Sequence, residues 1–224
     1  MRWLVPVTCL CALLAVPASA QVPDEVLAVG CKGTFGPDTT GESLARLFGP
    51  QNVKTVTVGY ESSGDEREET ILFPRVGHSA EVQIIWAYRY VQSKPTDVTV
   101  YGGELDFKTR TKASPRAWRS VSGVQVMMTV PQLEALNGRP FKIVGDSTHG
   151  YASVGSWEGG RLGRDADGCR LDVRLIFFDV PRGVEWGYTT CPLCPDVSSA
   201  DPKVRAYSGH VYSFTVRRPA GEGK

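Results

Sequence analysis

The sequence predicts an α+β protein of two similar halves, each a short helix packed on an antiparallel sheet. A segment at 39–51 recurs at 127–140, where Thr40, Leu44, Leu47 and Gly49 are matched, 89 positions later, by Thr129, Leu133, Leu136 and Gly138. Each copy is followed by short runs rich in β-branched and aromatic residues that Gly, Ser and Pro interrupt. We therefore expect a first α+β repeat at 21–110, a linker at 111–122 and a second repeat at 123–224.

Residues 1–20 are typical of a secretory signal peptide. Arg2 precedes an apolar run, which ends in the small-x-small pattern of Ala18, Ser19 and Ala20. The run is broken by prolines and is short for a membrane anchor, and no cysteine follows the cleavage site. We expect an exported protein, periplasmic or secreted, with no membrane span after the leader is removed.

Each predicted helix begins at a capping box and ends at a glycine. Thr39 with Glu42, and Thr129 with Gln132, match the pattern in which side chain and backbone satisfy each other at a helix start. Gly49 and Gly138 stand where a left-handed residue commonly ends a helix. Both helices should therefore be short, about two to three turns.

The predicted strands alternate between apolar and polar residues. Leu171, Val173, Leu175 and Phe177 show the period of two that indicates a sheet with one face on a core. The first half should hold strands at 53–60, 69–74, 81–91 and 97–103, and the second at 141–145, 150–157, 169–178 and 210–217.

The stretch VMMTVPQLEALNGRP, residues 126–140, resembles a helix signature shared by two families. These are the β-lactamase inhibitor proteins and the small lipoproteins of the outer-membrane β-barrel assembly machine. The glycine usual in these families before the Met-Thr pair is Met127 in this chain. The resemblance implies a tandem α+β protein that binds other proteins through a sheet face, and it favours a bacterial origin.

The balance of charge gives no general reason to expect nucleic acid or anionic lipid as a partner. The chain has 25 Lys and Arg against 24 Asp and Glu, and Arg2 leaves with the leader. Partners of those classes usually attract a basic excess. The expected partner is therefore the one that the resemblance implies, another protein.

Four cysteines remain after the leader is removed, an even number that favours two disulfides in an oxidising compartment. Three pairings are open, and we favour Cys31 with Cys169 and Cys191 with Cys194. The Cys191-Pro-Leu-Cys194 spacing also matches a redox dithiol. The segment that follows shows no helical period, so the helix dipole that activates such a thiol is not expected. Cys31 and Cys169 lack the spacing of a second pair of zinc ligands.

A small hydrolase around Ser147 and His149 is the other enzymatic alternative. Residues 143–150, IVGDSTHG, are similar to the nucleophile block of the Gly-Asp-Ser esterases. The late Asp-x-x-His pair of that family is absent, and a polar hairpin turn explains the stretch more simply. Residues 165–168, DADG, similarly match only part of a calcium loop and fit a turn before the next strand.

Two surfaces remain as candidates for binding. Trp86, Tyr88 and Tyr90 share one strand face and fit either a core or an interface, since both select aromatic residues. Lys108, Arg110 and Lys112 alternate along a basic segment and fit either a solubilised edge strand or a patch for an anionic partner. The sequence thus favours a non-enzymatic binding protein with no cofactor.

Overall fold

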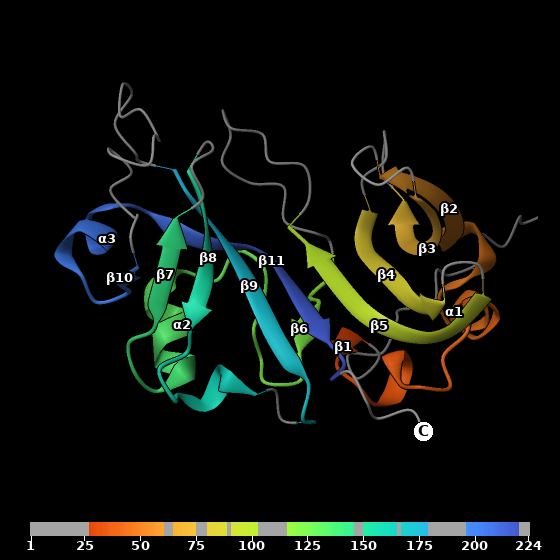
Figure 1. The fold of residues 1–224 in the computed structure, drawn as a ribbon, viewed down its shortest axis with the longest axis horizontal. Helices are drawn as coiled ribbons and strands as arrows, with labels where there is room; N and C mark the ends of the chain where they lie inside the picture. The colour runs from red at the N-terminus through yellow and green to blue at the C-terminus, as the bar shows by residue number, and fades with distance from the viewer. Residues whose placement is uncertain are drawn as a thin grey trace, which may run out of the picture.

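The structure, a computed structural model, describes residues 27–60, 65–74, 80–88, 91–102, 116–145, 150–164, 167–178 and 196–219. It confirms the α+β class, with a large antiparallel sheet and few helices (Figure 1). None of the helices found in those ranges has both the length and the apolar character needed to span a bilayer.

In the part of the chain that the structure describes, nine strands form the main sheet, in the order β10-β7-β8-β9-β11-β5-β4-β3-β2. Every neighbouring pair is antiparallel. The strands are β2 (Val53–Tyr60), β3 (Asp65–Pro74), β4 (Ala80–Tyr88), β5 (Val91–Tyr101), β7 (Lys142–Gly145), β8 (Tyr151–Ser156), β9 (Arg170–Phe177), β10 (Val197–Ser198) and β11 (Gly209–Arg217). All eight predicted strands are therefore present, with ends shifted by a few residues.

The pairing of β5 with β11 joins the two predicted halves into one sheet. Asp97 lies opposite Arg217 and Thr99 opposite Thr215 in this pair. A second, two-stranded parallel sheet of β1 (Ala28–Val29) and β6 (Arg119–Ser120) links the start of the described chain to its middle. The repeat boundaries at 21–110, 111–122 and 123–224 stay a prediction.

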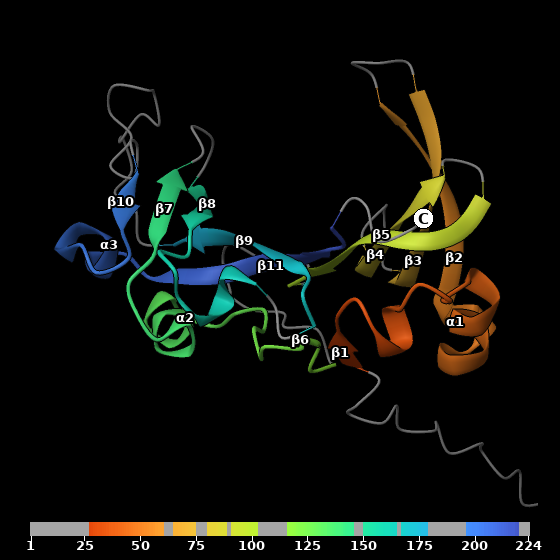
Figure 2. The same ribbon diagram turned by 60° about the horizontal axis from the view of Figure 1, so that its bottom comes forward.

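Two helices lie on the same face of the main sheet (Figure 2). They are α1 (Gly41–Phe48) and α2 (Val130–Asn137), and the shorter α3 (Pro202–Ala206) lies beyond β10 at one end of the sheet. Three 3-10 turns complete the described elements: η2 (Gly33–Phe35), η3 (Pro50–Asn52) and η4 (Arg161–Gly163). The two ends of the sheet rise away from α1 and α2, so the opposite face is concave.

The helix starts confirm one predicted cap and correct the other. The box of Thr129 and Gln132 is present at α2. At α1 the N-cap is Thr40, whose side chain accepts from the Ser43 amide, and Thr39 is instead buried. Thr39 was the wrong choice because the helix begins one residue later, so that Thr40 is the flanking residue. The Thr39 hydroxyl instead donates to the Thr34 carbonyl.

The helix ends follow the prediction. Gly49 and Gly138 are the C-cap residues, and their positive φ values of 87° and 82° are ones that glycine adopts without a steric penalty. Gly138 has the left-handed helical conformation, whereas Gly49 has an extended ψ of 138°. A third helix, α3, lies in the segment for which no helical period was expected. Asp201 caps it by accepting from the Lys203 amide, so a local hydrogen bond rather than an apolar stripe marks its start.

Residues 61–69, ESSGDEREE, form an acidic segment that runs into β3. Asp65 begins β3, and Glu69 is buried in the middle of the sheet. Residues 61–64, between β2 and β3, fall outside the described residues. β3 therefore begins at Asp65, four residues before the strand predicted at 69–74.

Buried apolar side chains fill the space between the sheet and the helices. Phe35, Phe48 and Phe73 each pack against Trp118, with ring centroids 5.7–6.2 Å apart. At the other end, Phe141 packs on Trp157 at 5.4 Å. These contacts belong to one continuous core, which extends beneath both α1 and α2.

Candidate binding face

The main sheet has one face covered by helices and one that no described helix covers. Val98, Val100, Phe214 and Val216 point to the covered side and are buried. Because neighbouring side chains alternate along a strand, the residues between them point the other way. We call this second surface the helix-free face. In its central strands it comprises Asp97, Thr99 and Tyr101 of β5, Tyr212, Ser213, Thr215 and Arg217 of β11, Arg170, Asp172 and Arg174 of β9, and Tyr151 and Ser153 of β8.

An ionic ladder crosses the helix-free face from β5 to β9. Arg217 of β11 forms ion pairs with Asp97 of β5 on one side and Asp172 of β9 on the other, the latter at 3.4 Å. Arg170 Nε lies 2.8 Å from Asp172 Oδ1. The hydrogen bond to Asp97 is the main cause that raises the pKa of Arg217. Arg170 and Arg217 keep 69% and 49% of their side chains exposed, so both can also contact a partner.

A tyrosine pair lies beside this ladder. The rings of Tyr151 and Tyr212 meet edge to face, with centroids 5.2 Å apart, and the Arg174 guanidinium carbon lies 5.7 Å from the Tyr151 centroid. Burial is the largest influence on Tyr151 and raises its pKa, as does Tyr212, whereas Arg174 acts in the opposite direction. The Tyr151 phenol is therefore neutral at physiological pH.

Buried hydrogen bonds hold the strands next to the ladder in place. The Glu69 carboxylate is fully buried and accepts from Arg67 Nε at 2.6 Å and from the Gln83 amide. The Tyr101 hydroxyl in turn donates to Gln83 Oε1. Such a network of satisfied buried groups favours a rigid surface.

A second buried carboxylate, Glu81, lies at the start of β4. Glu81 accepts from Arg116 Nη1 and from Trp118 Nε1, each at 3.0 Å. Arg116 also lies 3.4 Å above the Phe73 ring. Glu81 thus has a structural role in tying β4 to the segment before β6.

The structure places Trp86 in the core. Its side chain is 5% exposed, and its Nε1 donates to Thr70 Oγ1 at 3.1 Å. This matches the core alternative for the aromatic strand face. Tyr88 ends β4, but its side chain lies outside the described residues, as do all atoms of Tyr90.

The remaining predicted site residues also lie outside the described part of the chain. They are the basic residues Lys108, Arg110 and Lys112, the hydrolase candidates Ser147 and His149, and the dithiol candidates Cys191 and Cys194. The surroundings of 146–149 can still be described, because β7 and β8 are antiparallel neighbours. This arrangement matches the hairpin predicted between Val144 and Tyr151.

The tyrosine pair and the ionic ladder did not emerge from the sequence. The alternation in 169–178 identified Leu171, Val173 and Leu175 as core residues, and all three are buried. The same alternation places Arg170, Asp172 and Arg174 on the opposite face. The sequence alone could therefore have predicted that these three residues share one face of a strand. The neighbouring residues of β5 and β11 could be added only once the strand order was known.

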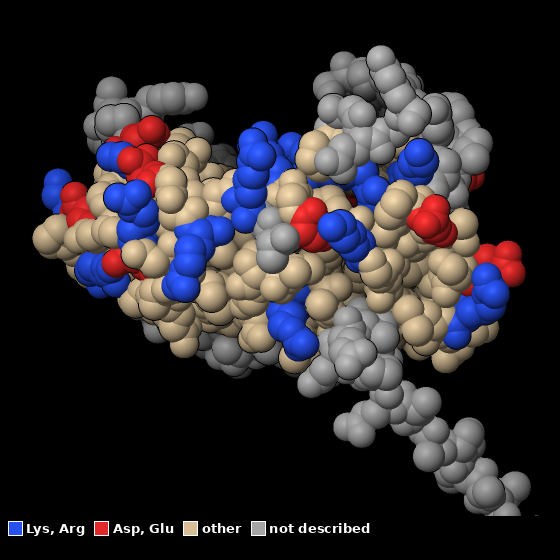
Figure 3. All heavy atoms as spheres, turned by 90° about the horizontal axis from the view of Figure 1, so that it is seen from below, with Lys and Arg blue, Asp and Glu red and all other residues tan. Residues whose placement is uncertain are grey.

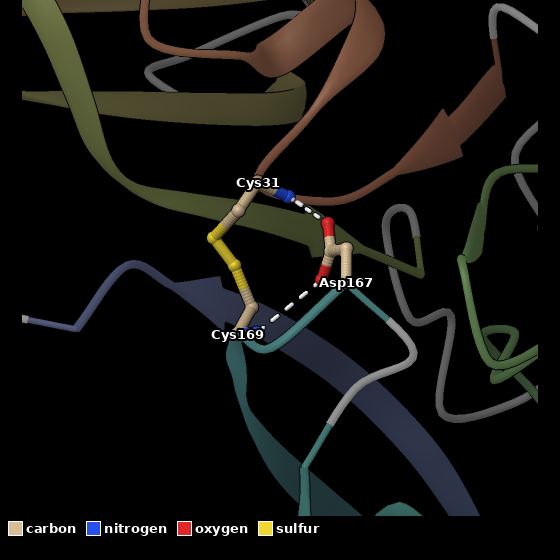
Figure 4. A group of neighbouring side chains, drawn as sticks. All are labelled: Cys31, Asp167 and Cys169. Atoms are coloured by element: carbon tan, nitrogen blue, oxygen red, sulfur yellow. Dashed lines mark hydrogen bonds between the residues drawn. A yellow bond between two sulfur atoms is a disulfide. The ribbon is translucent and has the colours of Figure 1, made fainter. Parts of the chain in front are cut away.

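The disulfide between Cys31 and Cys169 confirms one predicted pairing (Figure 4). Its Cα atoms are 5.9 Å apart, and it closes a separation of 138 residues. The Asp167 carboxylate accepts hydrogen bonds from the backbone N–H of both cysteines. The three side chains could form a metal-binding group by proximity, but the two sulfurs are bonded to each other and cannot serve as thiolate ligands in this state.

A hollow of about 380 Å³ lies on the helix side, beside the start of α1. Segment 32–39 forms most of its wall, and Ser43, Leu44 and Leu47 complete it. Leu47 is 44% exposed there. None of the sequence-predicted site residues lines this hollow.

Basic and acidic side chains are dispersed over the side of the molecule drawn in Figure 3. Lysine and arginine are spread along it, with acidic residues among them. This distribution agrees with the nearly balanced composition.

Comparisons with known proteins add little to this picture. No family model matches the chain, and no characterised protein sequence matches it. Among solved structures, the crystal structure of the uncharacterized protein yfeY from Escherichia coli is similar, with a TM-score of 0.44 and 14% identity over 85% of this chain and 99% of that one. A similarity at this level carries no argument about function.

Proposed function

We propose that this chain is an exported, non-enzymatic binding protein whose helix-free face contacts another envelope or extracellular protein. The observation that carries the proposal is the gathering of Tyr151, Tyr212 and the ladder arginines on the sheet face that no described helix covers. Tyrosine and arginine are enriched where binding energy concentrates in protein interfaces.

Rigidity of this face supports the proposal. The tyrosine pair and the ladder arise from four adjacent strands, β8, β9, β11 and β5, so their spacing is set by the sheet. A preformed surface loses little side-chain freedom when a partner binds, which favours affinity. The contact residues we propose are therefore Tyr151, Arg170, Arg174, Tyr212 and Arg217 rather than the buried Trp86.

We further propose that the chain is built from two copies of one α+β unit. The first helix precedes β2, β3, β4 and β5, and the second precedes β7, β8, β9 and β11. In the sheet the last strands of the two series, β5 and β11, lie side by side. From this pair each series continues outward to its first strand, β2 on one side and β7 on the other. The N-caps Thr40 and Thr129 and the C-caps Gly49 and Gly138 occupy matching positions in helices of equal length.

Export is part of the proposal. The leader-like residues 1–20 support it, and the Cys31–Cys169 disulfide is compatible with an extracytoplasmic location. Cleavage after Ala20, giving a mature chain that begins at Gln21, can be checked by N-terminal sequencing of the exported protein.

Matched charge reversals test the binding face. Arg170 on the helix-free face and Arg46 on α1 are both largely exposed, with 69% and 74% of their side chains accessible. The experiment captures envelope proteins on the purified chain, with Arg170→Glu and Tyr212→Ala as face variants and Arg46→Glu as the control. We expect the two face variants to lose a protein that the wild type and the control both retain.

Folding must be checked in the same preparations. Circular dichroism and thermal unfolding of each variant separate loss of the surface from loss of the fold. Retention of every captured protein by folded Arg170→Glu and Tyr212→Ala would rule out this face as the contact surface.

A further inference from the structure

Charged side chains hold both backbone groups of Cys31. The Cys31 N–H donates to Asp167 Oδ2, across 136 residues of sequence. The Cys31 carbonyl accepts from Arg218 Nη2 at 3.2 Å, and the same nitrogen donates to the Phe35 carbonyl at 3.4 Å. None of these hydrogen bonds involves the sulfur atom, so none of them requires the disulfide.

Asp167 contacts the other cysteine at the same time (Figure 4). Its Oδ1 accepts from the Cys169 N–H at 3.3 Å, so one carboxylate bridges the backbones of both bonded cysteines. A carboxylate oxygen of Asp167 also lies within 4.8 Å of each sulfur. Hydrogen bonds to an ionised acceptor are stronger than those between neutral groups. The carboxylate therefore joins the two cysteine backbones without using the bond between their sulfurs.

Gly30 leaves the space that this carboxylate occupies. It is buried and directly precedes Cys31. A side-chain carbon at position 30 would overlap Asp167 Oδ2 and Val121 Cγ2. Gly30 is not one of the glycines with a positive φ, so the requirement is steric rather than conformational. The absence of a side chain at position 30 thus admits the Asp167 carboxylate to the Cys31 N–H.

We propose that Asp167 is a positioning residue that promotes formation of the Cys31–Cys169 bond. In the dithiol form of the chain, its two hydrogen bonds keep the cysteines next to each other. Two reacting groups held in place behave as if each were present at a high effective concentration for the other. The bond then forms from thiols that the fold has already brought together. This role is independent of the helix-free face and of any partner.

The chemistry is thiol–disulfide exchange with a small-molecule disulfide, for which oxidised glutathione is the probe. Cys31 is half-buried and Cys169 fully buried, so the Cys31 thiolate attacks the glutathione disulfide first. One glutathione thiolate leaves, and a mixed disulfide forms. The Cys169 thiolate then attacks the Cys31 sulfur and releases the second glutathione. Two electrons and two protons pass from the cysteines to glutathione, and Asp167 sets only the distance for the second attack.

The measurement uses a chain that carries Cys191→Ser and Cys194→Ser, so that Cys31 and Cys169 are its only pair. The ratio of disulfide to dithiol in buffers of reduced and oxidised glutathione gives the effective concentration of the two thiols. We expect Asp167→Asn to lower it about tenfold, because an amide has one acceptor oxygen for two N–H groups and no charge.

Gly30→Ala tests the same contact from the other side. It keeps the carboxylate but displaces it from the Cys31 N–H, so it should also lower the effective concentration. Combining Gly30→Ala with Asp167→Asn should cause less than the sum of the two effects, because both changes remove one hydrogen bond.

Asp201→Asn is the matched control. Asp201 accepts from the N–H two residues ahead, as Asp167 does, but it caps α3 and does not bridge the cysteines. This variant should keep the effective concentration of the parent chain. An Asp167→Asn value no lower than that of Asp201→Asn would overturn the proposal.

Urea unfolding of the oxidised and reduced forms separates positioning from general stabilisation. If Asp167 positions the cysteines, Asp167→Asn costs the oxidised form more stability than the reduced form, which relaxes when the contact is lost. An equal loss in both forms would show that Asp167 only stabilises the fold, and would likewise overturn the proposal.

Discussion

Met127 has a backbone φ of 66°, in the left-handed region that only glycine adopts without cost. It stands two residues before the α2 cap, where its N–H donates to the Val211 carbonyl. The adjacent Met128 carbonyl accepts from the Val211 amide, so two backbone hydrogen bonds with Val211 tie this stretch to β11.

Replacing Met127 separates backbone strain from side-chain contact. Met127→Gly and Met127→Ala both remove the side chain, but only glycine relieves the positive φ. We expect the glycine variant to be more stable than the alanine variant by about 1 kcal/mol, from urea unfolding. Equal stabilities would mean that the backbone at this position carries no strain.

At the scale of elements, each helix depends on hydrogen bonds at its ends as well as on its buried face. Leu44 and Leu133 are buried at matching positions of α1 and α2, while Leu47 is exposed. Both helices are only eight residues long, so most of their stability must come from caps and packing.

The α1 cap can be tested by comparing neighbouring substitutions. Thr40→Ala should lower the free energy of unfolding by about 1 kcal/mol, because the Ser43 amide loses its acceptor. Thr40→Ser keeps the hydroxyl and should be close to wild type. Glu42→Ala should change stability by less than about 0.5 kcal/mol, since Glu42 does not close the capping box.

The measurement is chemical denaturation of the three variants under one set of conditions. If Glu42→Ala lowered the free energy of unfolding more than Thr40→Ala does, the capping box predicted for Thr39 and Glu42 would be favoured over the one formed by Thr40 and Ser43.

At the scale of the whole molecule, two connections unite the chain. The β5–β11 pair joins strands from the two predicted halves, and the Cys31–Cys169 disulfide joins the segment after β1 to the start of β9. Both connections link residues far apart in sequence, but only the covalent disulfide persists in the unfolded chain and restricts it.

Removing the long-range disulfide should therefore be costly. We expect Cys31→Ser with Cys169→Ser to lose about 4 kcal/mol of stability, because a bridge across more than 100 residues removes a large part of the unfolded-state entropy. Reduction of the wild type should have a similar effect. A double variant as stable as the wild type would show that the bridge does not constrain the unfolded chain.

Cys191→Ser with Cys194→Ser provides the comparison. If these two cysteines pair with each other, as we predict, their small loop should contribute less stability than the long-range bridge. Free-thiol counting of the unfolded wild type checks that pairing directly.

The sequence by itself determined the local elements of this protein. Alternation placed the eight longer strands and glycine placed the ends of α1 and α2. Threonine placed the start of α2, whereas the start of α1 was predicted one residue early. The even cysteine count led to the Cys31–Cys169 pair. These features depend on neighbours within a few residues or, for the disulfide, on the few pairings available.

Only the tertiary structure decided which face of the sheet the described helices leave uncovered. A period of two shows that a strand has two faces but cannot show which face the helices cover, so the sequence favoured a core position for Trp86 and left an interface open. Strand order, which depends on contacts between distant segments, placed Trp86 in the core and brought Tyr151, Tyr212 and Arg217 together on the other side.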